Sequence, residues 1–466
     1  MNRKKTTLIL AAALALTSAA SGCGRTGYED FVFPEQEKST LAPVDSIYRD
    51  NSGDDLTPVK EKTNRTVRSS DGLCVIECKD SYYDVTLDYE KGSPYAVGAA
   101  YAEAIKLACP DYEAFCEGYI FENIKAAFND LNDDYTGIEN RTEKFCAALD
   151  KDYRDELDGF ADKISGDSTG IHEDGILSKE EAALAQLVPD VLRGTACSAI
   201  SADGNVTSTG ERLTCRVLEW QLGSENQLCD SHTLLHIRNG DKSFISLSYL
   251  GSMTILTAVN DDGVMLGELD VGSLNMVEYS CENKVSYTYG MRYALENCTT
   301  AREAAEYLVS NAASYPYCVN VLATDKNDAF VAELSVTAED GVPLIRDSST
   351  PLTDGLKWDS PDYICAVNSF AADGNADGIT ENTNNLIRWN RYNDLFCGEG
   401  DLSPARMRQL LTCEKTDNDL VRIRSGGLVH MAVADYSTCT LCAILTDSDG
   451  VDDEQVFIDL GSWKQG

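Results

Sequence analysis

The sequence is poor in basic residues and in histidine. Lysine and arginine together number 39 against 77 aspartate and glutamate residues, and four histidines barely alter the net charge of −38. A polyanion would be repelled by this charge and would gain no counterion release, so nucleic acid is excluded as a partner. A phosphate-binding loop, a dinucleotide fingerprint and a Ser-His-Asp order are also absent from the sequence.

The rest of the composition is that of a globular protein. A hydrophobic fraction of 43% and a charged fraction of 25% exclude collagen, a coiled coil and wholesale disorder. A chain of 466 residues predicts roughly two or three packing units. Seventeen cysteines are an odd number, which leaves at least one thiol unpaired or modified, and a core of this size needs no disulfides.

Residues 1–23 have the pattern of a secretion signal. Arg3, Lys4 and Lys5 precede an apolar stretch over 8–20 that is too short to span a bilayer as a mature helix. The segment ends in Ala-Ser-Gly-Cys, which resembles the bacterial lipobox and predicts a lipid on Cys23. We therefore expect a secreted protein at the cell surface, lipid-anchored to a bacterial membrane. Plain secretion with an incidental cysteine is the alternative.

The next two segments differ in pattern. Residues 24–70 are rich in small polar residues and proline without apolar periodicity, which predicts a disordered tether. Residues 71–196 are mostly helical in pattern after one strand-like run at 73–77. Ser93 before Pro94 predicts a helix start, and Ser178 with Glu181 forms a capping box.

From residue 197 to 466 the pattern favours strands. Two helices are expected within them, at about 301–313 and 384–396, and a third is expected to start at Pro404. This alternation predicts an α+β layered domain rather than repeated βαβ units. The expected strands are 197–201, 213–220, 234–238, 244–249, 254–259, 263–269, 319–324, 329–334, 363–367, 428–434, 440–445 and 456–460.

Cys197 opens the first of these strands. A cysteine in this position is most often a buried hydrophobe. The returning strand, however, carries Arg216 and Glu219, which would bring a cation and a carboxylate beside the thiol. A guanidinium stabilises a thiolate, and a carboxylate can orient an amine. The alternative is that Arg216 and Glu219 form a surface ion pair of little energetic value.

The stretch from Cys197 to Ile200, the hairpin and the stretch from Cys215 to Trp220 resemble a known nucleophile hairpin. It is that of the N-terminal nucleophile hydrolases related to isopenicillin-N acyltransferase, with choloylglycine hydrolases and acid ceramidase as more distant relatives. The resemblance covers the chain from about residue 72 and implies a four-layer αββα fold preceded by a mostly helical segment. Further matching segments are 92–98, 260–264, 292–298, 319–325, 331–333, 366–370 and 388–391.

The resemblance also implies a mechanism. The Cys197 thiol would attack the carbonyl of Ala196, and hydrolysis of the resulting thioester would leave Cys197 as a new N-terminus. Its α-amine would then act as general base for the thiol. The implied substrate is a linear, non-peptide acyl amide that is hydrolysed or whose acyl group is transferred, without a cofactor.

Other residues receive roles by the same resemblance. Asn320 would stabilise the oxyanion, Arg216 the thiolate, and Glu219 would orient the amine, while Asn368 and Arg388 would shape or polarise the site. From the residues alone, Asn320 and Asn368 could instead satisfy strand ends or turns. Arg388, together with Arg391, could instead lie on a solvated helix face.

The chain departs from the family pattern at three positions. Glu219 stands where the family has Asp, Val217 where it has Asn, and Asp270 lies near an Asn that donates to the oxyanion in choloylglycine hydrolases. An ionised aspartate cannot donate a hydrogen bond. These departures keep open a second function, that of a catalytically inactive member of the fold serving as a ligand-binding or interaction lipoprotein.

One segment matches a calcium-binding loop only in part. Asp373, Asn375 and Asp377 reproduce the opening of a calcium loop, but Asn384 at the twelfth position cannot supply the bidentate carboxylate. We therefore expect no metal and interpret the segment as a polar loop. The sequence does not specify the acyl chain, the amine or the oligomeric state.

Overall fold

The computed structural model describes nine ranges of the chain. They are residues 65–127, 134–192, 197–271, 281–337, 341–375, 378–380, 382–412, 427–446 and 457–464. The expected signal with Cys23, most of the tether, Ala196 and Asp377 lie outside the described residues. In the nine described ranges no helix is long and apolar enough to cross a membrane.

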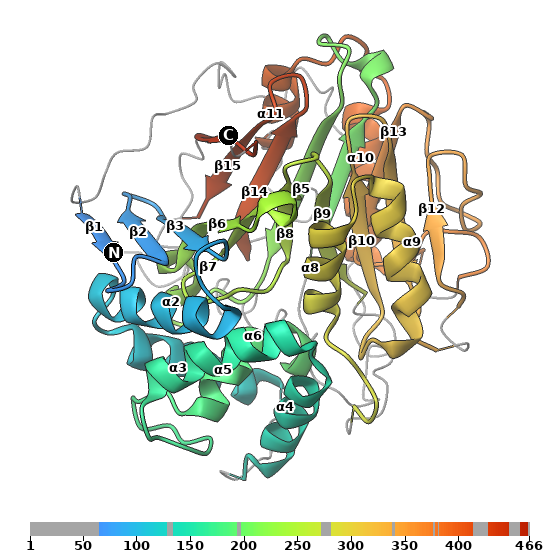
Figure 1. Cartoon of the computed structure of the whole chain (residues 1–466). Helices are drawn as coiled ribbons and strands as arrows, with labels where there is room; N and C mark the ends of the chain where they lie inside the picture. Colours follow the sequence, from blue (N-terminus) through green and yellow to red (C-terminus); the bar gives the residue numbers. More distant parts are fainter. Residues whose placement is uncertain are drawn as a thin grey trace, which may run out of the picture.

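A large sheet forms one of two central layers (Figure 1). Neighbouring strands pair antiparallel except β3 and β6, which pair parallel. The strands, in order across the sheet, are β1 (Arg65–Arg68), β2 (Cys74–Cys78), β3 (Tyr83–Asp88), β6 (His232–Arg238), β7 (Phe244–Tyr249), β8 (Thr257–Asn260), β9 (Met265–Asp270), β10 (Val319–Thr324), β11 (Ala329–Leu334) and β12 (Leu344–Arg346).

A smaller antiparallel sheet forms the second layer. Its middle contains the hairpin of β4 and β5, flanked by β13 on one side and β14 on the other. The strands, in order, are β13 (Tyr363–Val367), β4 (Ser198–Ala202), β5 (Leu213–Glu219), β14 (Leu428–Asp435), β15 (Thr440–Leu445) and β16 (Ile458–Ser462).

The two sheets pack face to face. Side chains meet across the interface, where the Thr257 hydroxyl lies 3.0 Å from His430 Nε2 and the Thr214 hydroxyl donates to Thr324 at 3.3 Å. An apolar cluster shared by both sheets fills part of the same layer. Because strand side chains alternate, each sheet has a second face that needs a cover.

Helices cover the outer faces. α8 (Tyr287–Asn297) and α9 (Ala301–Asn311) lie on the large sheet, and α10 (Thr383–Phe396) and α11 (Pro404–Thr412) share a core with the small sheet. The layers therefore follow the order αββα, which confirms the predicted fold class. Short elements elsewhere are α7 (Gln227–Asp230), η2 (Gly204–Val206), η3 (Gly240–Lys242) and η4 (Ala312–Ser314).

The N-terminal part is helical, as predicted, but it also supplies strands. β1 begins at Arg65 inside the expected tether, so the tether boundary at residue 70 is wrong by about one strand. β1 to β3 extend the large sheet, and β3 pairs with β6 of the C-terminal part. The helices are α2 (Pro94–Ala108), α3 (Tyr112–Ala127), α4 (Thr136–Ala148), α5 (Lys151–Ser165) and α6 (Lys179–Leu192).

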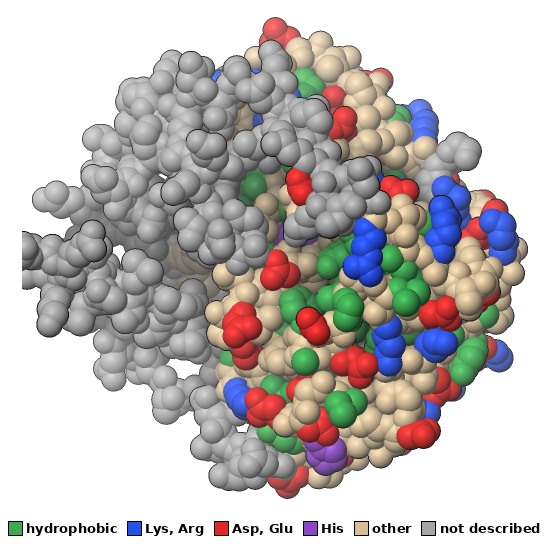
Figure 2. Space-filling view, turned by 90° about the vertical axis from the view of Figure 1, so that its left-hand side faces the viewer, with side chains coloured by type: hydrophobic (Ala, Val, Ile, Leu, Met, Phe, Trp, Pro, Cys, Tyr) green, Lys and Arg blue, Asp and Glu red, His purple; other side chains and the backbone are tan. Residues whose placement is uncertain are grey.

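Two helix starts form as predicted. The Ser93 hydroxyl caps α2, with Pro94 at its first position. Ser178 and Glu181 form the reciprocal capping box of α6: the Ser178 N–H donates to Glu181 Oε2 at 2.7 Å, and the Glu181 N–H donates to Ser178 Oγ at 3.0 Å. α3, α4 and α5 pack with α6 at one end of the molecule (Figure 1). On the face shown in Figure 2, acidic and basic side chains are interspersed.

Candidate active site

The hairpin of β4 and β5 brings Cys197 and Arg216 to one face. Ala199 pairs with Arg216 and Ser198 with Val217, so residue 197 shares the inner side with Arg216 by strand alternation. That side faces the large sheet. The alternate residues of β5, which include Cys215 and Val217, face α10 and α11 instead.

The Cys197 thiol has two contacts from β5. Arg216 Nη2 donates to Cys197 Sγ at 3.3 Å, and Sγ lies 3.9 Å from the backbone carbonyl oxygen of Glu219. Cys197 and Arg216 are fully buried, and Glu219 is 2% exposed. A surface ion pair is therefore excluded. The guanidinium stabilises the thiolate form of its sulfur neighbour.

The backbone nitrogen of Cys197 has a side-chain acceptor of its own. β13 pairs with β4 up to Val367 opposite Ser198, which brings Asn368 opposite Cys197. The N–H of Cys197 donates to Asn368 Oδ1. Asn368 Nδ2 in turn donates to the carbonyl oxygen of Asp270 at 2.6 Å, which ties the amide to the end of β9.

Arg388 of α10 reaches the same point from the outer layer. Its Nη1 donates to the Cys197 carbonyl oxygen at 2.6 Å and lies 3.4 Å from Glu219 Oε2. Its Nη2 donates to Oδ1 of Asn368 at 2.9 Å and of Asn385 at 2.6 Å. Arg388 is 2% exposed, so the alternative of a solvated helix face is wrong for it. That alternative is also wrong for Arg391, which is buried.

Asn320 has the contacts of a strand-end residue. Its Nδ2 donates to the carbonyl oxygens of Val367 at 3.0 Å and of Ser369 at 2.8 Å. Both amide hydrogens are thus engaged on either side of Asn368. In this structure Asn320 holds the loop that carries Asn368, and its predicted role as oxyanion donor would require these bonds to be exchanged. Its Oδ1 is buried and has no hydrogen-bond partner in the nine described ranges.

Two further residues of β9 lie close to Arg216. Gly267 allows the close approach, because a Cβ there would lie 2.6 Å from Arg216 Cγ. Arg216 Nη2 donates to the carbonyl oxygen of Glu268 and lies 3.8 Å from Glu268 Oε2. Burial raises the pKa of Glu268 to about 8, although Arg216 opposes this shift. Asp270, predicted near the site, is also buried.

The two histidines between the sheets have structural contacts. His430 contacts the Thr257 hydroxyl, and His232 lies with its ring centroid 6.4 Å from that of His430. Burial lowers the pKa of His232 to about 4 and holds the pKa of His430 well below its usual value. Both rings are therefore neutral at physiological pH.

Asn375 of the expected calcium loop has other contacts. Asn375 Nδ2 donates to Glu333 Oε2 at 2.7 Å, and its Oδ1 accepts from the Val342 N–H at 3.0 Å. Both ends of the amide are engaged in packing the loop against β11. Among the described residues, no group of three or more His, Cys, Asp or Glu side chains could hold a metal ion.

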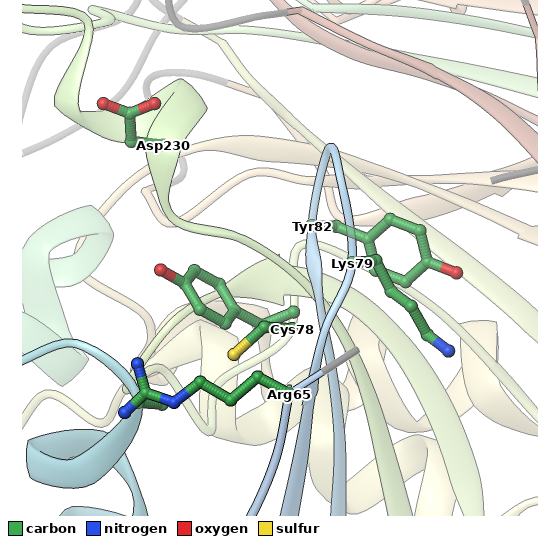
Figure 3. Close-up of a pocket in the computed structure, with 7 residues that line it drawn as sticks. Arg65, Cys78, Lys79, Tyr82 and Asp230 are labelled. Carbon is green, nitrogen blue, oxygen red and sulfur yellow. The ribbon is translucent and has the colours of Figure 1, made fainter. Parts of the chain in front are cut away.

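Cys197 is fully buried in the described structure. Two surface cavities have volumes of about 210 and 380 Å³, and Cys197 does not line either of them. The smaller lies beside β2 and β3, where Arg65, Cys78, Lys79, Tyr82 and Asp230 surround it (Figure 3). The described contacts of the thiol are with protein groups, among them Arg216 and the backbone carbonyl of Glu219.

Two contributors to this centre escaped the sequence analysis. Asn385 donates to the carbonyl oxygen of Asn368 at 2.9 Å and to Ser369 Oγ at 2.7 Å, and Glu268 contacts Arg216. Asn385 lies one helical turn before Arg388, at the i, i−3 spacing that places two residues on one helix face. That spacing was a usable signal, whereas Glu268 carried none.

No family model matches the chain, and no curated protein does. Solved structures similar to it include a Caenorhabditis elegans N-acylethanolamine-hydrolyzing acid amidase ortholog (13% identity, 52% of this chain, 93% of that chain, TM-score 0.37). A second is a mutant of conjugated bile acid hydrolase from Clostridium perfringens (10% identity, 58% of this chain, 94% of that chain, TM-score 0.33). A third is penicillin V acylase from Agrobacterium tumefaciens (12% identity, 58% of this chain, 89% of that chain, TM-score 0.31). By their printed names these proteins are an amidase, a hydrolase and an acylase.

Proposed function

We propose that this protein is a self-processing cysteine amidase or acyltransferase that acts on a linear, non-peptide acyl amide through Cys197. One observation carries the proposal. The thiol, the backbone nitrogen and the carbonyl oxygen of Cys197 each contact a different buried side chain, from Arg216, Asn368 and Arg388 respectively. A cysteine that only fills a core needs none of these partners.

The first step would occur within the chain. The Cys197 sulfur attacks the carbonyl carbon of Ala196, the bond to the Cys197 nitrogen breaks, and that nitrogen takes up a proton. Water then hydrolyses the thioester, which leaves a carboxylate at Ala196 and a free thiol at Cys197. The new α-amine has an ordinary pKa of about 8 and can accept the thiol proton in later turnovers.

The described contacts support the roles proposed for the amine and the thiol of Cys197. Asn368 Oδ1 already accepts a hydrogen bond from the nitrogen that would become the amine, so the base would be held in orientation. Arg388 links the Cys197 carbonyl oxygen to the Glu219 carboxylate, so the carboxylate would be held beside Cys197. Arg216 supplies the positive charge beside the sulfur.

Hydrolysis of acyl amides tests the activity directly. Purified protein is incubated with a panel of N-acyl amides that differ in chain length and amine, and an acyl thioester on the Cys197 peptide is sought by mass spectrometry. We expect hydrolysis or transfer in the wild type and none in Cys197→Ala. Cys215→Ala is the matched control, because Cys215 is buried in the adjacent strand and faces the outer core.

A second outcome would favour the binding-protein alternative. If the folded wild type binds an acyl amide without hydrolysing it, and if Cys197→Ala binds equally well, then the protein is a ligand-binding member of the fold. Retention of hydrolysis in Cys197→Ala would also contradict the proposal. In either case Cys197 is not the nucleophile.

We further propose that the chain is anchored at the cell surface through a lipid on Cys23. The support is the charged start of the chain, its short apolar stretch and the Ala-Ser-Gly-Cys ending. Replacement of Cys23 by Ala is expected to move the protein from the membrane fraction to the medium. Wild-type protein found wholly in the medium would contradict the anchor.

A further inference from the structure

The Glu268 carboxyl lies between the two sheets with one oxygen unsatisfied. Glu268 is 4% exposed, and its Oε1 has no hydrogen-bond partner among the described residues. Buried polar atoms are nearly always hydrogen-bonded, so an orphaned carboxyl oxygen indicates a functional or strained position. The other oxygen, Oε2, lies 3.8 Å from Arg216 Nη2.

Arg216 therefore contacts two groups that can become anions. Its Nη2 donates to Cys197 Sγ at 3.3 Å, on the side of the guanidinium that also meets Glu268. Within the part of the chain that the structure describes, its Nε and Nη1 have no hydrogen-bond partner. A single positive charge thus serves both the thiol and the carboxyl in a buried layer, where such interactions are strong.

The surrounding charges act on Glu268 from several elements. Asp270 on β9 and Asp190 on α6 disfavour its ionisation, and Arg216 on β5 favours it. Tyr287 on α8 also faces Glu268 and stays neutral because burial holds its pKa well above the ordinary value. With desolvation as the largest cause, the pKa of Glu268 is raised to about 8, so the carboxyl carries a proton at neutral pH.

We propose, on the basis of the function proposed above, that Cys197 and Glu268 share one negative charge beside Arg216, and that Glu268 is a positioning residue that reserves Arg216 for the thiolate. While Glu268 is neutral, the guanidinium charge stabilises the sulfur anion. Once Glu268 loses its proton to solvent, two anions compete for one cation and the thiolate becomes less favourable. The two groups then titrate as a coupled pair.

The thiolate of Cys197 can be measured without access to the buried sulfur. Ultraviolet thiolate absorbance is recorded against pH for the full-length protein and for its Cys197→Ser counterpart, and the difference cancels the other cysteines. The same pair is measured in a Glu268→Gln background, in which the neutral amide imitates the protonated carboxyl. Glu156→Gln is the matched control, because Glu156 is equally buried and paired with Arg292 at 2.6 Å.

We expect the Cys197 thiolate signal of Glu268→Gln to match the wild type near pH 6 and to exceed it above about pH 8. The ratio of thiolate to thiol should differ by about tenfold near pH 9, the size expected when a like charge is removed a few ångströms away. Glu156→Gln should follow the wild type throughout, with circular dichroism showing each variant folded.

Two results would overturn the inference. One is superimposable profiles for the wild type and Glu268→Gln, and the other is a constant offset at every pH, which indicates a merely structural effect. If Glu268→Gln unfolds, Glu268→Asp is measured in its place. Its Cys197 thiolate signal, taken as the difference from the Cys197→Ser counterpart, is expected to follow that of the wild type with pH. Loss of the proposed function is a separate result, because an uncut and inactive wild type leaves the thiolate profiles measurable.

Discussion

The N–H of Cys197 donates to the side-chain oxygen of Asn368, a residue 171 positions later in the chain. The bond joins the start of β4 to the end of β13, and it fixes the nitrogen that the proposed cleavage would turn into an amine. Arg388 also donates to that Asn368 oxygen. The oxygen is therefore an acceptor shared by two donors in a buried site. Removing this oxygen takes away an acceptor of the Cys197 N–H and leaves Arg388 Nη2 with its bond to Asn385.

Asn368→Ala is expected to slow chain cleavage by about 10- to 100-fold, corresponding to the roughly 1–3 kcal/mol that a buried unpaired donor costs. The rate is measured by the appearance of the shorter chain on denaturing gels after synthesis. Asn393→Ala is the matched control, since Asn393 is a buried amide of α10 that contacts Asp359 instead. Equal rates in both variants would remove Asn368 from the mechanism.

Gly267→Ala tests the close approach of Arg216 to β9. An added Cβ would lie 2.6 Å from Arg216 Cγ, which forces the arginine side chain to move. We expect a loss of about 1–3 kcal/mol in the free energy of unfolding, typical of overpacking, together with slower thiol chemistry at Cys197. Denaturant titration and cleavage rates provide the two readouts.

The control for that substitution is Gly118→Ala in α3, where a Cβ meets no atom within 4 Å. Alanine there should leave cleavage unchanged and raise stability slightly, because a helix interior favours alanine over glycine. If Gly267→Ala behaves like Gly118→Ala, the packing account of Arg216 is wrong.

Asp190 gives a pH-dependent contribution to stability. Its side chain accepts from Ser286 at 2.8 Å and from Thr288 at 2.7 Å, and burial nevertheless raises its pKa to about 6. A carboxyl whose pKa is raised on folding contributes stability below its unfolded pKa of about 4, and that stability is lost as pH rises through about 6.

The free energy of unfolding of the wild type is therefore expected to fall by up to ~3 kcal/mol between about pH 4 and pH 6. Asp190→Asn is expected to lack this fall. Urea titrations of wild type and variant across this range measure the difference. Asp162→Asn is the control, because Asp162 is half exposed and its pKa is lowered by Lys179. Parallel pH curves for wild type and Asp190→Asn would contradict the prediction.

The two pieces produced by cleavage should stay together. β3 pairs in parallel with β6 along its whole length, and Glu156 of α5 contacts Arg292 of α8 at 2.6 Å. We expect the pieces to co-elute in native size-exclusion chromatography and to separate in denaturant. Native release of the N-terminal piece would show that these contacts are too weak to hold it.

The C-terminal strands could be predicted because their apolar runs are short and bounded by turns. Residues 319–324, 329–334 and 363–367 form strands with the predicted limits. β3, the three-residue β12 and α8 escaped prediction. β3 has mixed polarity over Tyr83–Asp88, and it is a strand because β2 and β6 flank it.

The residues of the site could be predicted, but not all of the contacts between them. The hairpin brought Cys197 and Arg216 together through local pairing, which sequence order specifies. Arg216 and Glu219 are three positions apart, however, and strand alternation turns them to opposite faces. Glu219 therefore reaches the centre through Arg388, a partner from a distant helix that only the tertiary structure could supply.

The most direct test of the account is the mass and N-terminal sequence of the purified, folded chain, with wild type beside Cys197→Ala. The account predicts that the wild type is cut between Ala196 and Cys197, so that a chain beginning with Cys197 is found, while Cys197→Ala stays whole. A folded wild type that remains a single uncut chain would contradict the account, because Cys197 would then have no free amine to act as base.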